Sequence, residues 1–383
     1  MLEKIEKRLP IRAFFRKHIH AYQVPATLNA WYVFGLLAIV FVVIQLLSGF
    51  WMVMFYVPTV REAFSSVQML MHQVPAGWFI RYLHTTGASF LFIVLYLHIF
   101  RGFLYGSYHQ PRELVWVLGV ILWLVMMIEA FMGYVLPWGQ MSYWGAQVVT
   151  SALDGLPFIG SSLKYWLRGG YEVGQPLLQR FYAFHIILLP FLLFLLIKFH
   201  IIAIRYVGSS EPIESSKPSK KISFYPQHLL KEAIPAAIVL TLFFMVLFFW
   251  PSLGGVVIEN LNQVPANPLV TPASIHPPWY ITPFFAILRA IPNLSFGVLF
   301  TLLALFLFFM MPVLDKSEHR VLFFKKPIFR YMVYIFWLNF IFLGILGWFE
   351  VNTLRLLLAR VFILFYFAFF LLMPWYSRQK EAK

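Results

Sequence analysis

The chain has 383 residues, of which 61% are hydrophobic, 20% are aromatic and only 12% are charged. Soluble globular domains carry about 25% charged residues, so this composition indicates a membrane protein. The formal net charge is +15, but its placement between apolar stretches favours membrane topology over nucleic-acid binding. The chain has no cysteine, which excludes disulfides, cysteine-ligated iron–sulfur clusters and haem attached through CxxCH.

Residues 1–20 are basic and amphipathic, without a cleavable signal pattern, and predict a helix lying on the membrane surface. Eight apolar stretches long enough to span a bilayer follow at 31–57, 79–101, 114–136, 181–204, 233–250, 294–314, 331–349 and 355–374. The predicted fold class is therefore an all-α integral membrane protein with eight transmembrane helices. With both termini on the inner side, 21 Lys and Arg residues lie inside and 8 lie outside, in agreement with the positive-inside rule.

The second and fourth spans carry two histidines each. His84 and His98 are 14 residues apart, which places them about 21 Å apart along a helix and nearly on one face. His185 and His200 are 15 residues apart, which leaves a twist of about 60°. Pairing His84 with His185 (outer) and His98 with His200 (inner) gives two sites, each able to hold a haem iron between two imidazoles. Ordinary polar packing is the alternative, but four intramembrane histidines in matched pairs are costly without a function.

Two pairs of glycines repeat the 14-residue spacing in the neighbouring spans. Gly35 and Gly49 lie in the first span, and Gly119 and Gly133 lie in the third. Glycine lets a flat macrocycle approach the backbone closely, although glycines also aid helix packing in membranes. The repetition at both predicted haem depths favours a role in haem binding.

Arginines recur at the ends of the histidine-bearing spans. Arg81, Arg101 and Arg180 are placed where a guanidinium can bind the propionate of a haem. Snorkelling toward lipid head groups is the alternative. For Arg81 and Arg101, which lie three residues from a histidine, propionate binding is the favoured interpretation.

Two long outer segments, 136–179 and 251–293, are rich in aromatic residues and proline, and they are predicted to cover a site at the membrane surface. The inner segment 207–221 is rich in Ser, Pro and Lys, which is typical of a flexible connection. We therefore expect a surface helix and haem-binding four-helix bundle over 1–206, a connection over 207–232, and a second four-helix half over 233–383.

Several runs together resemble cytochrome b, the di-haem membrane subunit of quinol-oxidising cytochrome bc complexes. They are RYLHTTGAS, YLHIFRGFLYGSY, GYVLPWGQMSYWGA, RFYAFH, ANPLVTPASIHPPWY and AILRAIPN. The resemblance covers nearly the whole chain. It implies a dimeric quinol:cytochrome c oxidoreductase in an energy-transducing inner membrane, in contact with lipid, with a Rieske iron–sulfur protein and a c-type cytochrome as partners.

The resemblance also implies a divided electron path. Quinol at an outer site gives one electron to the Rieske cluster, and the other crosses two non-covalent b haems to an inner quinone, with coupled proton translocation. The outer pocket would include Phe131, Gly133, Tyr134, Pro137, Trp138, Tyr143, Pro277, Trp279 and Tyr280. The inner quinone site would use Arg205, Lys231 and Glu232.

The chain departs from the family pattern at the quinol site. The usual motif is PEWY, whose Glu is thought to accept a quinol proton, but Pro278 replaces that Glu here. Tyr134 and Tyr280 keep the family pattern as candidate catalytic residues. We predict that either Glu129, four residues before Gly133 on one helix face, or His276 takes the proton instead. A structural hydrogen bond to a neighbouring helix is the alternative for Glu129.

Two further departures concern the chloroplast and cyanobacterial relatives. They share the 15-residue interval between His185 and His200, but they are split into two chains. Val33 stands where they carry the cysteine that anchors an extra haem, so no third haem is expected.

Two other functions are compatible with parts of the sequence. A two-haem membrane anchor of another dehydrogenase would explain the four histidines, but not the PPWY motif or the long outer segments. A cofactor-free transporter is compatible with eight spans and scattered prolines.

Overall fold

The computed structural model describes residues 20–211, 220–317 and 327–378, together with Arg8 and Arg16. The predicted surface helix over 1–20 and most of the connection over 207–221 lie outside the described residues. Within these described residues, eight helices are long and apolar enough to cross a membrane: Ala30–Val53, Gly77–Leu104, Glu113–Val135, Gln175–Val207, Phe224–Phe249, Leu294–Leu314, Pro327–Trp348 and Thr353–Leu371. All eight predicted spans are therefore confirmed.

The long helices are α3 (Val33–Val53), α5 (Gly77–Leu104), α6 (Glu113–Val135), α10 (Leu189–Val207), α11 (Leu229–Phe249), α13 (Leu294–Leu314), α15 (Pro327–Trp348) and α16 (Thr353–Leu371). The shorter α-helices are α4 (Ala63–Gln73), α7 (Gln140–Ala152), α8 (Gly160–Arg168), α9 (Gln175–Ala183), α12 (Thr282–Ala290) and α17 (Met373–Tyr376). Short 3-10 or π turns are η2 (Ala30–Tyr32), η3 (Leu153–Gly155), η4 (Phe184–Leu188), η5 (Phe224–His228), η6 (Leu253–Gly255) and η7 (Asn260–Gln263). Strands β1 (Gln23–Pro25) and β2 (Lys221–Ser223) pair antiparallel.

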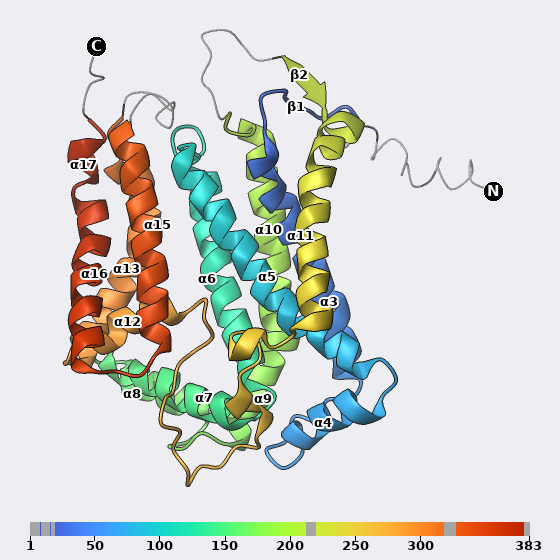
Figure 1. Cartoon of the computed structure of the whole chain (residues 1–383), viewed down its shortest axis with the longest axis vertical. Helices are drawn as coiled ribbons and strands as arrows, with labels where there is room; N and C mark the ends of the chain where they lie inside the picture. The colour runs from blue at the N-terminus through green and yellow to red at the C-terminus, as the bar shows by residue number, and fades with distance from the viewer. Residues whose placement is uncertain (1–7, 9–15, 17–19, 212–219, 318–326, 379–383) are drawn as a thin grey trace.

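The long helices form a bundle with two different ends (Figure 1). One end carries β1, β2 and α17, and we call it the strand end. The other end carries α4, α7, α8 and α9, and we call it the loop end. The segment 251–281 also lies at the loop end, where Gln140 N donates to Val264 O over 2.9 Å. The even number of spans brings β1 and α17 to the same end, as the sequence predicts.

The fifth long helix, α11, packs with the first four rather than with the last three. It lies against α3 and α5, where the buried Phe243 ring has its centroid 5.2 Å from Phe41 and 5.3 Å from Phe90. The predicted division at 207–232 assigned α11 to the second half. In space, the chain crosses to the group of α12, α13, α15 and α16 only after α11.

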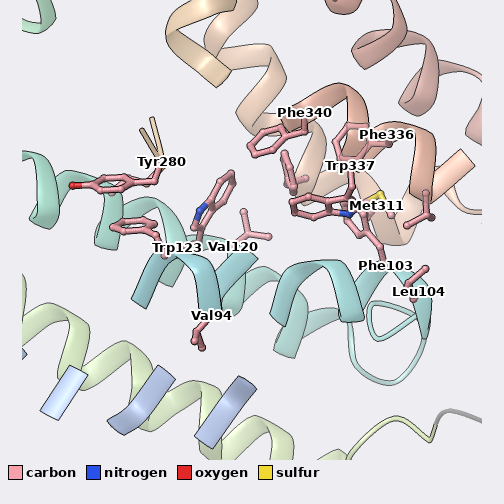
Figure 2. Close-up of a cluster of buried hydrophobic side chains, with 14 of the residues drawn as sticks. Val94, Phe103, Leu104, Val120, Trp123, Tyr280, Met311, Phe336, Trp337 and Phe340 are labelled. Carbon is pink, nitrogen blue, oxygen red and sulfur yellow. The ribbon is translucent and has the colours of Figure 1, made fainter. Parts of the chain in front are cut away.

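An aromatic cluster joins the two groups of helices. Phe103 on α5 contacts Phe308 on α13 and Phe336 on α15, each at a centroid distance of 5.7 Å. Figure 2 shows Phe103, Phe336 and Trp337 close together, with Trp123 and Tyr280 further along the same cluster. Interdigitated rings of this kind stabilise helix association in lipid, where van der Waals packing replaces the hydrophobic effect between helices.

A polar cluster joins the same two groups at the strand end. Asp315, directly after α13, accepts a hydrogen bond from Tyr108 Oη over 2.7 Å and lies 3.1 Å from His109 Nε2. Ser317 donates to the other carboxylate oxygen over 2.7 Å. Burial alone would raise the pKa of Asp315, but the bonds from His109, Tyr108 and Ser317 outweigh it and hold this pKa below its usual value.

Candidate functional site

Two of the four predicted histidines face each other near the loop end. The rings of His84 on α5 and His185 in η4 have centroids 6.1 Å apart and planes inclined by 85°. With a nitrogen–metal distance of about 2 Å, two imidazoles on opposite sides of one metal atom have centroids about 6 Å apart. The pair therefore fits a single iron held between two imidazole nitrogens.

Hydrogen bonds orient both rings through their Nδ1 atoms. Ser48 Oγ donates to the carbonyl of Ile44 over 2.6 Å and lies 3.0 Å from Nδ1 of His84, so it accepts from that nitrogen. Nδ1 of His185 lies 3.0 Å from both the carbonyl oxygen and Oε1 of Glu129. Partners of this kind fix the tautomer of a metal-ligating histidine and leave Nε2 for the metal.

A π-helical turn explains the 15-residue interval between His185 and His200. In η4 the N–H of Leu189 donates to the carbonyl of Phe184, an i→i+5 bond that takes up one extra residue. Pro190 follows directly; it has no N–H, and its ring would clash with the carbonyl of Ile186 in a regular helix. The extra residue is taken up within the turn that carries His185, so the twist expected between the two histidines is smaller than the ~60° of a regular helix.

The four histidines lie against the four predicted glycines. A Cβ atom at Gly133 would come within 2.5 Å of Cε1 of His185, closer than any real Cβ contact. The other built Cβ–Cε1 distances are 3.1 Å for Gly49 and His84, 3.2 Å for Gly119 and His200, and 3.5 Å for Gly35 and His98. The 14-residue glycine spacing thus accommodates histidine rings at two levels, one of which holds His84 and His185. His98 and His200, at the other level, are close enough to interact electrostatically.

The three predicted arginines are placed at both levels without a carboxylate partner. None of them forms an ion pair within 20–211, 220–317 and 327–378. Arg81 is 9% exposed, and Nε of Arg101 and Nη1 of Arg180 are buried without a hydrogen-bond partner. Because unpaired buried cations are costly, these groups fit an anionic ligand such as a haem propionate. Arg101 also lies over the ring of Tyr32 at 4.6 Å.

The two long outer segments meet at the loop end. Trp138 accepts a hydrogen bond from Ala266 N over 3.1 Å, and its φ of 52° is unusual for a side chain of this size. Trp138 also contacts the ring of Tyr143 at 5.9 Å. Pro137 belongs to the same turn, so the PWGQ run at residues 137–140 packs directly against the 251–293 segment.

The other predicted quinol residues lie around this junction. Trp279 donates from Nε1 to Ser89 Oγ on α5 over 3.2 Å, and the ring of Tyr280 stacks on Phe92 at 3.8 Å. Pro277 is buried beside them. The ring of Phe131 contacts Phe181 on α9 at 6.2 Å, in a hydrophobic cluster that also contains Trp138.

Glu259 joins the predicted site residues Tyr134 and His276, although the sequence had not pointed to it. Its Oε2 accepts a hydrogen bond from Tyr134 Oη, and its Oε1 lies 3.4 Å from Nδ1 of His276. Burial raises the pKa of Glu259 to about 7. One feature could have found it, because Glu259 is the only acidic residue within 251–293.

The predicted inner residues lie at the strand end. Arg205 is placed over the ring of Tyr22 at 5.1 Å, and Lys231 Nζ donates to the carbonyl of Ala26 over 3.2 Å. Glu232 is buried, with Oε1 3.2 Å from Nε2 of His228. His228 was missed, although its spacing of four residues from Glu232 puts both on one helix face.

Comparisons with known proteins cover both halves of the chain. A family model described as Cytochrome b/b6/petB matches residues 19–208, and one described as Cytochrome b(C-terminal)/b6/petD matches residues 265–367. Cytochrome b of Allochromatium vinosum is 44% identical over 100% of this chain and 96% of its own length. The chain belongs to the cytochrome b family. Cytochrome b of Rickettsia prowazekii is 42% identical over 97% of this chain and 92% of its own.

A solved structure extends the family assignment to a complex. A chain of the "Hyperthermophilic respiratory Complex III" matches with a TM-score of 0.91 and 34% identity, over 98% of both chains. The protein is therefore a cytochrome b subunit of a bc-type complex, an integral membrane protein that binds haem. The transporter and the unrelated membrane anchor are set aside, because the matches cover both halves.

Proposed function

We propose that this cytochrome b oxidises quinol at the loop end and passes electrons through two b haems to a quinone at the strand end. The observation that carries the proposal is the set of four histidines, each packed against a glycine, on helices that cross the membrane. His84 and His185 would hold one haem and His98 and His200 the other. When bound, the haems supply one-electron carriers at two depths of the bilayer.

The protein's own residues would orient and separate these carriers. Ser48 and Glu129 hold His84 and His185 through Nδ1, while Arg81, Arg180 and Arg101 offer cationic groups to the propionates. At the loop end, Tyr134 and Tyr280 would bind quinol between the two outer segments. At the strand end, Arg205, Lys231 and Glu232 offer polar groups to a quinone. Most of the Lys and Arg residues also lie in segments predicted to be on that side of the membrane.

The distribution of charge supports a strand end that faces the inner side of an energy-transducing membrane, with both termini there. Quinol oxidation on one side and quinone reduction on the other would release and take up protons on opposite sides. Catalysis would require a Rieske iron–sulfur protein and a c-type cytochrome, in a complex that contains a second copy of this chain. A Bradyrhizobium diazoefficiens relative named Cytochrome b/c1, 39% identical to this chain and matched over 55% of its own length, supports the c-type partner.

The test uses the purified complex with its partner subunits. Added quinol should reduce cytochrome c and, in the same preparation, the b haems. A complex that retains all its subunits and haems but oxidises no quinol would contradict the proposed function.

A further inference from the structure

The loop end contains a carboxyl group that the established family pattern does not assign. Glu259 is 7% exposed, although the next residues, Asn260 and Leu261, are exposed. The carboxyl group is thus buried one step from the outer surface. A buried carboxyl group needs hydrogen-bond partners or a bound proton; Tyr134 donates a hydrogen bond to it, and Nδ1 of His276 lies close to its other oxygen.

His276 holds the carboxylate in position rather than competing with it for a proton. Its Nδ1 lies 3.4 Å from Glu259 Oε1 and 3.3 Å from the carbonyl of Pro277. Because both neighbours are acceptors, Nδ1 carries the hydrogen. The ring lies on Trp348 with centroids 3.9 Å apart, and burial lowers the pKa of His276, which favours the neutral imidazole.

The titratable groups that face Glu259 favour their neutral forms, so no adjacent positive charge holds Glu259 in its ionised form. They are Tyr134 from α6, and His276 and Tyr280 from the segment around PPWY. The charge of Arg289 acts on His276, and the guanidinium of Arg289 donates hydrogen bonds to the carbonyls of Leu346 and Phe349.

Glu129 is less suited to the proton transfer. Its Oε1 lies 3.0 Å from Nδ1 of His185, so this oxygen helps to orient a predicted haem ligand, and its Oε2 is buried without a hydrogen-bond partner. Tyr134, by contrast, belongs to the predicted quinol pocket and donates a hydrogen bond directly to Glu259.

We propose that Glu259 accepts the quinol proton through the hydroxyl of Tyr134, in place of the Glu that Pro278 replaces; this rests on the proposed function. The quinol O–H bond breaks and its proton passes to Tyr134 Oη, while the proton of Tyr134 passes to Glu259 Oε2. The products are the quinol monoanion and a carboxylic acid, and no electron moves in this step. The anion is then oxidised by the one-electron acceptors of the complex. Glu259 releases its proton to the outer solution beside Asn260.

The test compares Glu259→Gln, Glu259→Asp and Tyr134→Phe with the control Glu172→Gln, which removes an exposed carboxylate from the other outer segment. The complex of each variant is purified, and quinol oxidation is measured from pH 5.5 to 8.5 together with haem content. A base must be deprotonated to act, so the wild-type rate should rise with pH around a midpoint of about 7. Glu259→Gln should lower the rate about 100-fold, as expected for a lost general base, and abolish this midpoint. Glu259→Asp should restore part of the rate, and the control should behave as wild type.

A second readout does not depend on turnover. Redox-induced infrared difference spectra should show a carboxylic-acid C=O band in the wild type that is absent in Glu259→Gln and present in Glu172→Gln. An unchanged pH profile and an unchanged band in Glu259→Gln with full haem content would overturn the proposal and leave the proposed function intact. Absence of quinol oxidation in the wild type would instead refute the proposed function. If Glu259→Gln fails to assemble, a normal rate and midpoint in Tyr134→Phe overturn the proposal.

Discussion

The loop end and the strand end both bury an acid beside a histidine, but the charges around these pairs differ. At the loop end, Glu259 is surrounded by neutral groups, and its pKa is raised to about 7. At the strand end, Glu232 pairs with His228, and the positive charge of Arg101 acts on Glu232. The neutral surroundings suit a group that takes up and releases protons, whereas cations suit a site that stabilises a reduced, anionic quinone.

The two levels also differ in how tightly the histidines are packed, and a matched pair of variants can test this. Gly133→Ala places a Cβ 2.5 Å from Cε1 of His185, whereas Gly35→Ala places one 3.5 Å from His98. Overpacking at Gly133 should cost about 1–3 kcal/mol and lower the temperature at which the loop-end haem is released. In Gly35→Ala the temperature of haem release should stay near that of the wild type. Equal behaviour of the two variants in a thermal haem-release assay would contradict the difference in packing.

The polar cluster at the strand end gives an effect of comparable size. Asp315→Asn removes the charge that binds His109 and Tyr108, and it should lower the free energy of unfolding by about 1.5–3 kcal/mol. The folded pKa of Asp315 lies below its unfolded value. Its contribution is therefore fully present above the unfolded pKa, about 3.9, and is lost as pH falls through the folded value.

Thermal unfolding at several pH values measures this contribution. The wild type should lose its advantage over Asp315→Asn as the pH falls below about 4. Ser65→Ala, which alters an exposed hydroxyl at the loop end, serves as a control. If the difference in unfolding temperature between the wild type and Asp315→Asn were the same at every pH, the charge of Asp315 would not contribute to stability.

The smallest expected effect concerns the potential of one haem. Glu129→Gln weakens the acceptor on Nδ1 of His185, makes the imidazole less electron-donating and should raise the loop-end haem potential. A shift of about 60 mV would correspond to a tenfold change in the equilibrium constant of a one-electron couple. The strand-end haem, which we propose His98 and His200 hold, serves as the internal control. Equal shifts of both haems would indicate a general disturbance instead.

Hydropathy and residue spacing were sufficient to predict the eight spans and to select the four histidines and four glycines. These features repeat regularly along helices, so their positions follow from helix geometry. The π turn at His185 did not follow, because it depends on how Pro190 is accommodated within a packed bundle. Glu259 was also missed, since a long irregular segment gives no periodicity from which the direction of a side chain can be inferred. The position of α11 was missed because a helix that is apolar on all sides does not reveal its neighbours.

We propose that four histidines on two membrane helices hold two haems at different depths. A redox-titrated optical spectrum of the purified protein, with a measured haem-to-protein ratio, is the decisive test. We expect two non-covalent b haems per chain that titrate at separate potentials, and one haem per chain in His185→Leu. A single haem in the wild type would show that one histidine pair is assigned wrongly, and the absence of haem would refute both pairs.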